Sequence, residues 1–187
     1  MRRTTSAVSG LVVLAFVAGW YVGHSGTADQ RALPLPAGAS VESCFSPGGE
    51  CTAVIVAALD DARRSVRMQA YSFTSARIAQ ALVEAHRRDI STEIILDKSQ
   101  VSERYSAADF TSRAGIPTFI DAEHAIAHNK VIILDGSTVI TGSFNFTKAA
   151  EERNAENVLI LRDQPELAAQ YLANYETHRE HSQPYAR

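Results

Sequence analysis

The chain has 187 residues, of which 45% are hydrophobic and 21% are charged. These values are typical of one globular domain with a short extension, and they exclude a largely disordered protein. The formal net charge of −3 argues against binding nucleic acid through bulk positive charge, so any polyanion must be held at a local site. The short basic groups Arg63–Arg67 and His86–Arg88 could form such a patch, or they could be solvated surface.

The N-terminus has the order of segments that is typical of a secretory signal. Arg2 and Arg3 precede an apolar run from about Ala7 to Val22. The run is shorter than the roughly 20 residues that cross a bilayer comfortably, so we expect cleavage, with a retained membrane anchor as the alternative. A buried core helix is disfavoured because glycines interrupt the run. We therefore expect an exported protein, periplasmic or secreted, with a signal peptide or anchor over residues 1–28, a linker over 29–40 and the folded domain over 41–187.

The two cysteines, Cys44 and Cys51, enclose a turn-rich segment that contains Pro47, Gly48 and Gly49. In the oxidising compartment that an exported protein enters, such a pair is expected to form a disulfide. A zinc site would need more ligands, and no further cysteine or nearby histidine supplies them. We therefore predict a Cys44–Cys51 disulfide.

The segment after the cysteines is predicted to alternate between helices and strands. Apolar periodicity and capping residues indicate, in chain order, a helix at Thr52–Ala62, a strand at Val66–Phe73, a helix from an N-cap at Thr74 to about Arg88, a strand at Thr92–Leu96, a helix at Arg104–Ala114 and a strand at Pro117–Ile120. The strands and the two later helices give the order βαβαβ.

The C-terminal half differs, because two strands there are joined by a tight turn. Val131–Leu134 and Thr138–Thr141 flank Asp135-Gly136, which predicts a β-hairpin. A strand at Val158–Leu161 and a helix at Pro165–His178 follow. We therefore expect an α/β fold in which a mixed β-sheet has helices on both faces.

Polar residues gather at the ends of these C-terminal strands. His128 and Lys130 precede the first strand of the hairpin, and Asp135 follows it. Because side chains alternate along a strand, His128 and Lys130 are expected on the same side. Further polar residues at the ends of the next strands are Ser143, Asn145 and Glu156.

The spacing of these residues resembles a known signature. His128-x-Lys130-x4-Asp135, followed by Gly142-Ser143-x-Asn145, is similar to the HKD motif of the phospholipase D superfamily. The segments Arg67–Thr74 and Gly142–Ala150 resemble the bacterial Nuc-type endonucleases, and the similarity runs from about Cys44 to the last helix. The resemblance implies a phospholipase D-like catalytic domain and a phosphodiesterase that uses no cofactor.

The chemistry of a phosphodiester suggests a role for each residue. The reaction centre is anionic, so the attacking group should be neutral and the phosphate charge should be offset. We expect neutral His128 to form a covalent phosphohistidine, while Lys130, Ser143 and Asn145 hold the phosphate oxygens. The resemblance implies that Glu156 fixes the tautomer of the histidine ring.

Asp135 belongs to the motif and is counted among the catalytic residues, although it could instead brace its own loop. The chain has a single HKD motif, yet the reaction also needs an acid that protonates the leaving oxygen. His124 is expected to be a loop residue and not this acid. Short family members pair two chains, so the resemblance implies a homodimer with one active site shared at the two-fold axis.

A metal-dependent mechanism is the alternative to this scheme. Asp97, Asp121, Glu123 and His124 could contribute to a divalent site, but they form no cluster with a shared face in the sequence. Lys130 also fills the charge-offsetting role of a metal. We therefore predict no metal requirement.

Three functions are compatible with the motif. The first is a non-specific endonuclease that cleaves DNA, since the chain contains no recognisable base-reading module and the phosphate suffices as a target. The second is a phospholipase D that acts on phosphatidyl diesters at a membrane, which a retained anchor would favour. The third, an inactive binding module, is disfavoured because His128, Lys130 and Asn145 are all present.

Overall fold

Residues 35–186 are described by a computed structural model. The expected signal peptide or anchor at 1–28 and most of the linker at 29–40 lie outside the described residues. Within the described part of the chain, no helix has the length and apolar character needed to cross a membrane.

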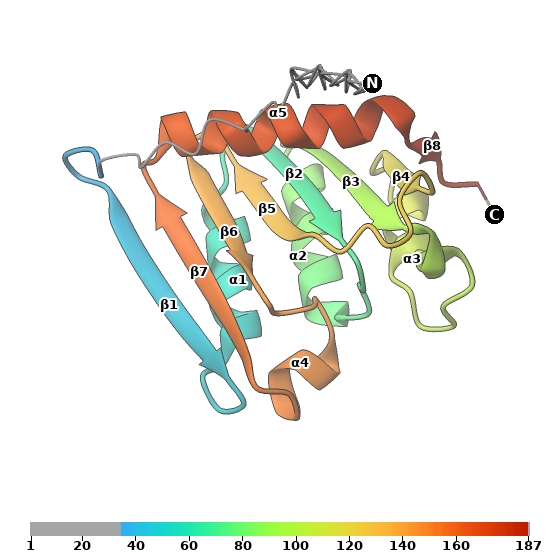
Figure 1. Ribbon diagram of the computed structural model, residues 1–187, viewed down its shortest axis with the longest axis horizontal. Coiled ribbons are helices and arrows are strands. Elements are labelled where there is room, and N and C mark those ends of the chain that lie inside the picture. The colour runs from blue at the N-terminus through green and yellow to red at the C-terminus, as the bar shows by residue number, and fades with distance from the viewer. Residues whose placement is uncertain (1–34, 187) are drawn as a thin grey trace, which may run out of the picture. The chain divides into compact units, whose positions relative to one another are not determined.

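The core of the fold is one eight-stranded sheet with the strand order β1-β7-β6-β5-β2-β3-β4-β8 (Figure 1). The strands are β1 (Ser40–Ser46), β2 (Ser65–Ala70), β3 (Ser91–Asp97), β4 (Thr118–Asp121), β5 (Lys130–Leu134), β6 (Thr138–Gly142), β7 (Glu156–Arg162) and β8 (Gln183–Pro184). Strands β2, β3 and β4 run parallel, and the other neighbouring pairs are antiparallel. The predicted mixed sheet is confirmed.

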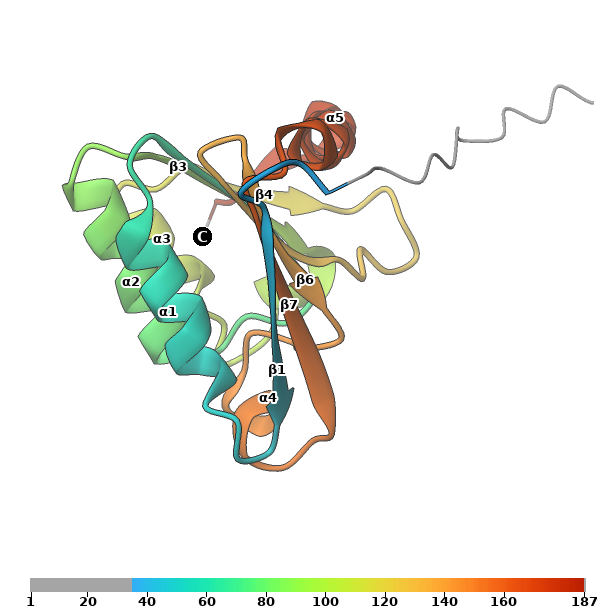
Figure 2. The same cartoon turned by 90° about the vertical axis from the view of Figure 1, so that its left-hand side faces the viewer.

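Helices cover both faces of this sheet, as predicted. They are α1 (Cys51–Asp61), α2 (Ala76–Arg87), the 3-10 helix η1 (Lys98–Val101), α3 (Ala108–Arg113), α4 (Lys148–Glu152) and α5 (Pro165–His181). Helices α1, α2 and α3 lie on one face, and α5 crosses the other face near one end of the strands (Figures 1 and 2). Much of the second face is therefore left without a covering helix.

Strand β5 lies in the middle of the sheet and is buried on both sides. Ile132 and Leu134 belong to the core beneath α1 and α2, whereas Val131 and Ile133 pack with residues of α5. All five residues of the strand are buried. Because both faces are packed, the position of Lys130 at the start of β5 is fixed by the core.

Element boundaries differ from the prediction where polar side chains or short segments decide them. The strand expected to reach Phe73 ends at Ala70, and the cap of α2 is Ser75 and not Thr74, since the Ser75 side chain accepts from Ile78 N. The helix expected from Arg104 begins only at Ala108. Four further elements, β1, η1, α4 and β8, were not predicted from the sequence.

The predicted disulfide is present. It joins Cys44 in β1 to Cys51 at the first position of α1, with the Cα atoms 5.6 Å apart. The link therefore ties the edge strand of the sheet to the helical layer on one face.

Candidate active site

His128 and Lys130 meet around an aromatic ring at the start of β5. The imidazole of His128 is on an exposed residue and packs on Tyr71, with the ring centroids 4.6 Å apart. Lys130 is 7% exposed, and its Nζ donates to the His128 carbonyl oxygen over 2.8 Å. The same Nζ lies 5.0 Å from the centroid of the Tyr71 ring. The structure therefore brings the expected nucleophile and the expected cation side by side.

Burial changes the proton affinity of Lys130. Loss of solvent lowers the pKa of its ammonium below the usual value, and the carboxylate of Glu156 partly opposes this shift. A cation with little solvent around it interacts strongly with an anion, since the effective dielectric constant is low. Lys130 is thus suited to offset the charge of a phosphate.

Ser143 and Glu156 are joined to each other and not to His128. Ser143 Oγ donates to Glu156 Oε2 over 2.6 Å, and Asn154 Nδ2 donates to Glu156 Oε1 over 3.0 Å. Among residues 35–186 the His128 ring has no hydrogen-bond partner, so the expected bond to Glu156 is not formed within one chain. Glu156 instead acts on Lys130 through its charge.

A glycine turns the chain between β6 and Ser143. A side chain at Gly142 would collide with the carbonyl oxygen of Asn157. This close approach lets Asn157 O accept from the amides of Ser143 and Phe144, over 3.1 and 3.3 Å. Strand β6 ends there, so Ser143 and Asn145 do not lie along one face of an extended strand.

Asn145, one of the candidates for phosphate binding, has a side-chain atom without a hydrogen-bond partner in the described part of the chain. This atom, Oδ1, is buried, and the residue lines a surface groove. Buried amides normally have partners, and the oxygen and nitrogen of an Asn amide can exchange places by rotation. Asn145 can therefore donate to an oxygen of a ligand in this groove.

The groove is built from two segments that are far apart in sequence. Phe73 bridges to Phe146, and Thr74 N donates to Phe146 O over 2.9 Å while Phe146 N donates to Ser72 O over 3.1 Å. These residues belong to Arg67–Thr74 and Gly142–Ala150, the two segments that resemble the nucleases. The groove has a volume of about 510 Å³, and its lining includes Tyr71, Glu103, Tyr105, Asn145, Lys148 and Arg153.

Three of the lining side chains, Tyr105, Lys148 and Arg153, were missed by the sequence analysis. An exposed tyrosine and two basic residues carry no distinctive spacing. The only signal was that Lys148 falls within the segment that resembles the nucleases.

Asp135 lies away from this site, and its contacts fit the alternative role of a brace. Strand β5, with five residues and a length of about 14 Å at roughly 3.4 Å per step, separates it from His128. Its carboxylate accepts from the backbone amides of Arg63, Arg64 and Ser65 over 2.7–3.2 Å. Burial raises the pKa of Asp135, but these hydrogen bonds outweigh burial and the pKa falls below its usual value. Asp135 braces the loop between α1 and β2.

The two basic groups considered in the sequence do not contribute to the site either. Arg67 donates to Ser91 at the start of β3, and Arg87 pairs with Glu84 on the surface of α2. Arg63 and Arg64 lie at the end of β2 opposite to Tyr71. These arginines are therefore surface and loop residues.

Comparison with known proteins gives consistent matches over most of the described chain. The family model described as "Cardiolipin synthase, PLD-like domain" matches residues 55–179. A phospholipase D from Rickettsia conorii is 48% identical over 135 residues, covering 72% of this chain and 67% of that protein. A mitochondrial cardiolipin hydrolase from Xenopus laevis is 32% identical over 134 residues, covering 72% of this chain and 59% of that protein.

A solved structure matches the fold at comparable length. Nuc from Salmonella typhimurium, a phospholipase D family member, superposes with a TM-score of 0.77 at 39% identity. The match covers 80% of this chain and 99% of that one.

Proposed function

Since the chain belongs to the phospholipase D superfamily and is therefore a phosphodiesterase, we propose that it is a metal-independent endonuclease that cleaves DNA through a phosphohistidine at His128. The observation that carries this proposal is the groove lined by Tyr71, the ring that His128 and Lys130 also contact, because the groove offers both aromatic and basic side chains. The likeness to Nuc supports it.

The proposed reaction has two displacements at phosphorus. A neutral ring nitrogen of His128 forms a bond to phosphorus, and the bond from phosphorus to the leaving oxygen breaks as that oxygen takes a proton from an acid. Water then attacks the phosphohistidine and gives its proton to the group that acted as the acid, and the bond from phosphorus to nitrogen breaks, which releases the phosphate monoester and free His128. Lys130 and Asn145 hold the non-bridging oxygens through both steps.

Ser143 and Glu156 are proposed to stabilise the positively charged groups of the site, Lys130 and the imidazolium of His128. The Ser143–Glu156 hydrogen bond positions a carboxylate near Lys130. This carboxylate keeps the ammonium charged and can accept from the imidazolium of His128 as charge develops during attack.

The lining of the groove favours a nucleic acid over a small diester. Tyr71 and Tyr105 offer flat faces on which bases can stack, and Lys148 and Arg153 can contact phosphates on either side of the scissile one. None of these contacts reads base edges, which fits cleavage with little sequence preference.

A phospholipid is the second candidate substrate, because the relatives named phospholipase D and cardiolipin hydrolase have that class in their names. Both substrates present the same phosphodiester to His128. They differ in the part of the substrate next to the phosphodiester, which the groove must hold.

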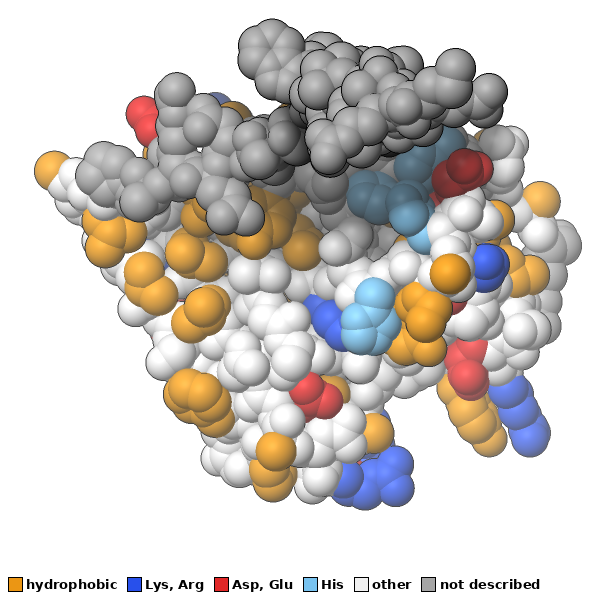
Figure 3. Space-filling view, viewed as in Figure 1, with side chains coloured by type: hydrophobic (Ala, Val, Ile, Leu, Met, Phe, Trp, Pro, Cys, Tyr) orange, Lys and Arg blue, Asp and Glu red, His pale blue; other side chains and the backbone are white. Residues whose placement is uncertain are grey.

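The acid for the leaving group is proposed to come from a second copy of the chain, whose His128 would face the first across a two-fold axis. The His128 ring is exposed and has no hydrogen-bond partner within residues 35–186. The face of the sheet that α5 leaves uncovered also exposes Val41, Phe45 and Leu159 of β1 and β7. In Figure 3 hydrophobic side chains gather over these strands on the face that also shows a histidine beside a basic side chain. A homodimer would cover both features.

The location of the enzyme is proposed to be outside the cytoplasm, in the periplasm or beyond. The Cys44–Cys51 disulfide supports this, because such bonds persist in oxidising compartments. The apolar N-terminal run would direct export or remain as an anchor.

The test is plasmid nicking by the full-length chain in excess EDTA, beside His128→Asn and the control His86→Asn, which changes a histidine on α2. We expect nicking by the wild type and the control, and a loss of at least about 10³-fold in His128→Asn, since no other group in the site replaces the nucleophile. Release of headgroup from phosphatidylcholine vesicles is measured in parallel. Vesicle hydrolysis without nicking would replace DNA by lipid as the substrate.

A further inference from the structure

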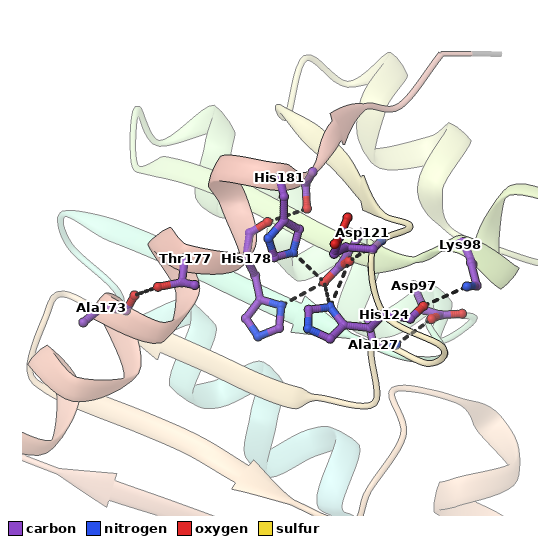
Figure 4. A network of polar contacts seen from close by, with 11 residues as sticks. Asp97, Lys98, Asp121, His124, Ala127, Ala173, Thr177, His178 and His181 are labelled. Atoms are coloured by element: carbon purple, nitrogen blue, oxygen red, sulfur yellow. Dashed lines mark hydrogen bonds and ion pairs between the residues drawn. The ribbon is translucent and has the colours of Figure 1, made fainter. Parts of the chain in front are cut away.

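A second cluster of polar side chains lies beneath the end of α5, outside the site described above. Asp121, the last residue of β4, is fully buried, and three imidazoles surround it (Figure 4). His124 comes from the loop between β4 and β5, and His178 and His181 come from the last turn of α5. The ligand atoms of these four residues all lie within 4.8 Å of one another.

All three imidazoles approach the same carboxylate oxygen. The Nδ1 atoms of His124 and His178 lie 3.0 and 2.8 Å from Asp121 Oδ2, and His181 Nε2 lies 3.3 Å from it. A carboxylate oxygen has two lone pairs, so three donors crowd it. His181 Nε2 is buried and has no hydrogen-bond partner in the described part of the chain. Hydrogen bonding alone therefore does not satisfy this cluster.

The spacing suits a small cation better. Zinc binds imidazole nitrogen and carboxylate oxygen at about 2.0–2.1 Å, which makes the edge of a tetrahedron of ligands about 3.3 Å long. The distance from Asp121 Oδ2 to His181 Nε2, 3.3 Å, equals this edge, and the distances to His124 and His178, 3.0 and 2.8 Å, are somewhat shorter. A slight outward movement of the rings would open the space for an ion.

We propose that Asp121, His124, His178 and His181 bind one zinc ion in a closed tetrahedral site of three nitrogens and one oxygen. Four protein ligands complete the coordination and leave no open position for water or substrate, which is the pattern of a structural and not a catalytic zinc site. The phosphodiester chemistry itself stays free of metal.

The ion would connect the C-terminal helix to the segment that carries the proposed nucleophile. His124 and His128 lie on the same loop, four residues apart. The loop is also held by Asp97, whose Oδ2 accepts from Ala127 N over 2.8 Å, and by Lys98, whose Nζ donates to His124 O over 2.7 Å (Figure 4). Zinc would add a third anchor to this loop, and it would join the loop to α5.

The test is metal binding by the untagged full-length chain after removal of metal, compared with His178→Asn and the control His86→Asn. We expect one Zn²⁺ per chain by calorimetric titration, and visible absorption bands of tetrahedral strength when Co²⁺ replaces Zn²⁺. His178→Asn should bind at least about 100-fold more weakly, because loss of a ligand exceeds the loss from an outer-shell change, while His86→Asn should bind like the wild type.

Thermal unfolding keeps the test decisive if His178→Asn does not fold. Free Zn²⁺ at 100 times its Kd should raise the Tm of the stripped wild type by about 5–10 °C. The proposal is overturned if folded, stripped wild type takes up no Zn²⁺, if its Co²⁺ spectrum is that of the hydrated ion, or if His178→Asn and His86→Asn bind equally.

Discussion

At Lys130, burial lowers the pKa of the ammonium while the charge of Glu156 raises it. The ammonium lies near the Tyr71 ring and donates to the His128 carbonyl oxygen. The carboxylate of Glu156 also acts on it through its negative charge. Burial holds the pKa of Lys130 below the usual value. The charged form that phosphate binding needs is therefore lost at a lower pH than for an exposed lysine.

The lowered pKa of Lys130 predicts that activity declines at alkaline pH. The kcat/KM of the wild type should fall with rising pH below the usual lysine pKa of 10.5, as Lys130 loses its proton. In Lys130→Arg this limb should disappear, since arginine stays charged, although the changed geometry should cost about 10–100-fold in rate at neutral pH. A chromogenic phosphodiester allows the measurement. The same alkaline limb in both enzymes would mean that another group causes it.

Asp135 was expected either to act in catalysis or to brace a loop, and its contacts favour the brace. Its carboxylate satisfies three backbone amides in the loop before β2, and its backbone adopts φ 56° in the tight turn to β6. Asparagine tolerates this conformation but lacks the charge. Asp135→Asn thus removes the charge-assisted hydrogen bonds and little else.

We predict that Asp135→Asn lowers the free energy of unfolding by about 1–3 kcal/mol and leaves kcat within about twofold of the wild type, which urea denaturation and a nicking assay measure. Because the folded pKa is depressed, the stabilisation is present above the unfolded value of 3.8 and is lost as the pH falls through the lower folded value. The difference between the two proteins should shrink over that window.

Asp89→Asn is the matched control, because Asp89 also has a positive φ, 62°, but is exposed and follows the C-terminus of α2. Removing a negative charge there should be neutral or slightly stabilising. A large loss of kcat in Asp135→Asn with unchanged stability would return Asp135 to the catalytic residues.

At the level of elements, β1 and β7 form an edge of the sheet with an exposed apolar side. Phe45 is 65% exposed and Leu159 is 36% exposed, although the strands that carry them are paired over seven positions. An uncovered apolar sheet face is typical of an interface. The apolar side chains lie on the same face of the molecule as an exposed histidine (Figure 3), which fits a dimer that completes the active site.

Phe45→Glu is therefore expected to weaken dimerisation by at least about 30-fold, the effect of 2 kcal/mol at a central contact. The nicking rate should fall with the dimer fraction. Sedimentation velocity over a range of concentrations measures the association, and Phe110→Glu, on the exposed side of α3, is the control. A monomeric Phe45→Glu with full activity would exclude the shared site.

Most of the elements could be predicted because their periodicity is strong. The buried β5, the Asp135–Gly136 turn and the capped α2 all follow from local sequence. Strand β1 was missed because its exposed residues break the alternation, and α4 because five residues, Lys148–Glu152, are too few for a helical period.

The candidate site was predictable only where spacing implies geometry. Alternation along the chain placed His128 beside Lys130. It could not show that Ser143 turns away to Glu156, because that depends on the approach of Gly142 to Asn157. Nor could it join Asp121 to His178, which lies 57 positions later and reaches it only through the packing of α5 on the sheet.

For the whole molecule, one sheet positions an exposed histidine, His128, and a separate cluster of three histidines around Asp121. His128 lies before β5 at the surface, and the cluster around Asp121 lies under the end of α5. In the proposed scheme the first performs covalent chemistry and the second holds the loop that carries it. Catalysis needs a neutral nucleophile and a fixed cation, and in this scheme His128 and Lys130 supply them. The zinc cluster is therefore separate from the chemistry.

The most direct test of this scheme is the stereochemical course at phosphorus. A phosphorothioate diester of known configuration is hydrolysed in ¹⁸O-water, and the configuration of the product is determined. A phosphohistidine requires two displacements, each with inversion, so we expect net retention. Net inversion would show that water attacks phosphorus directly and would contradict His128 as the nucleophile.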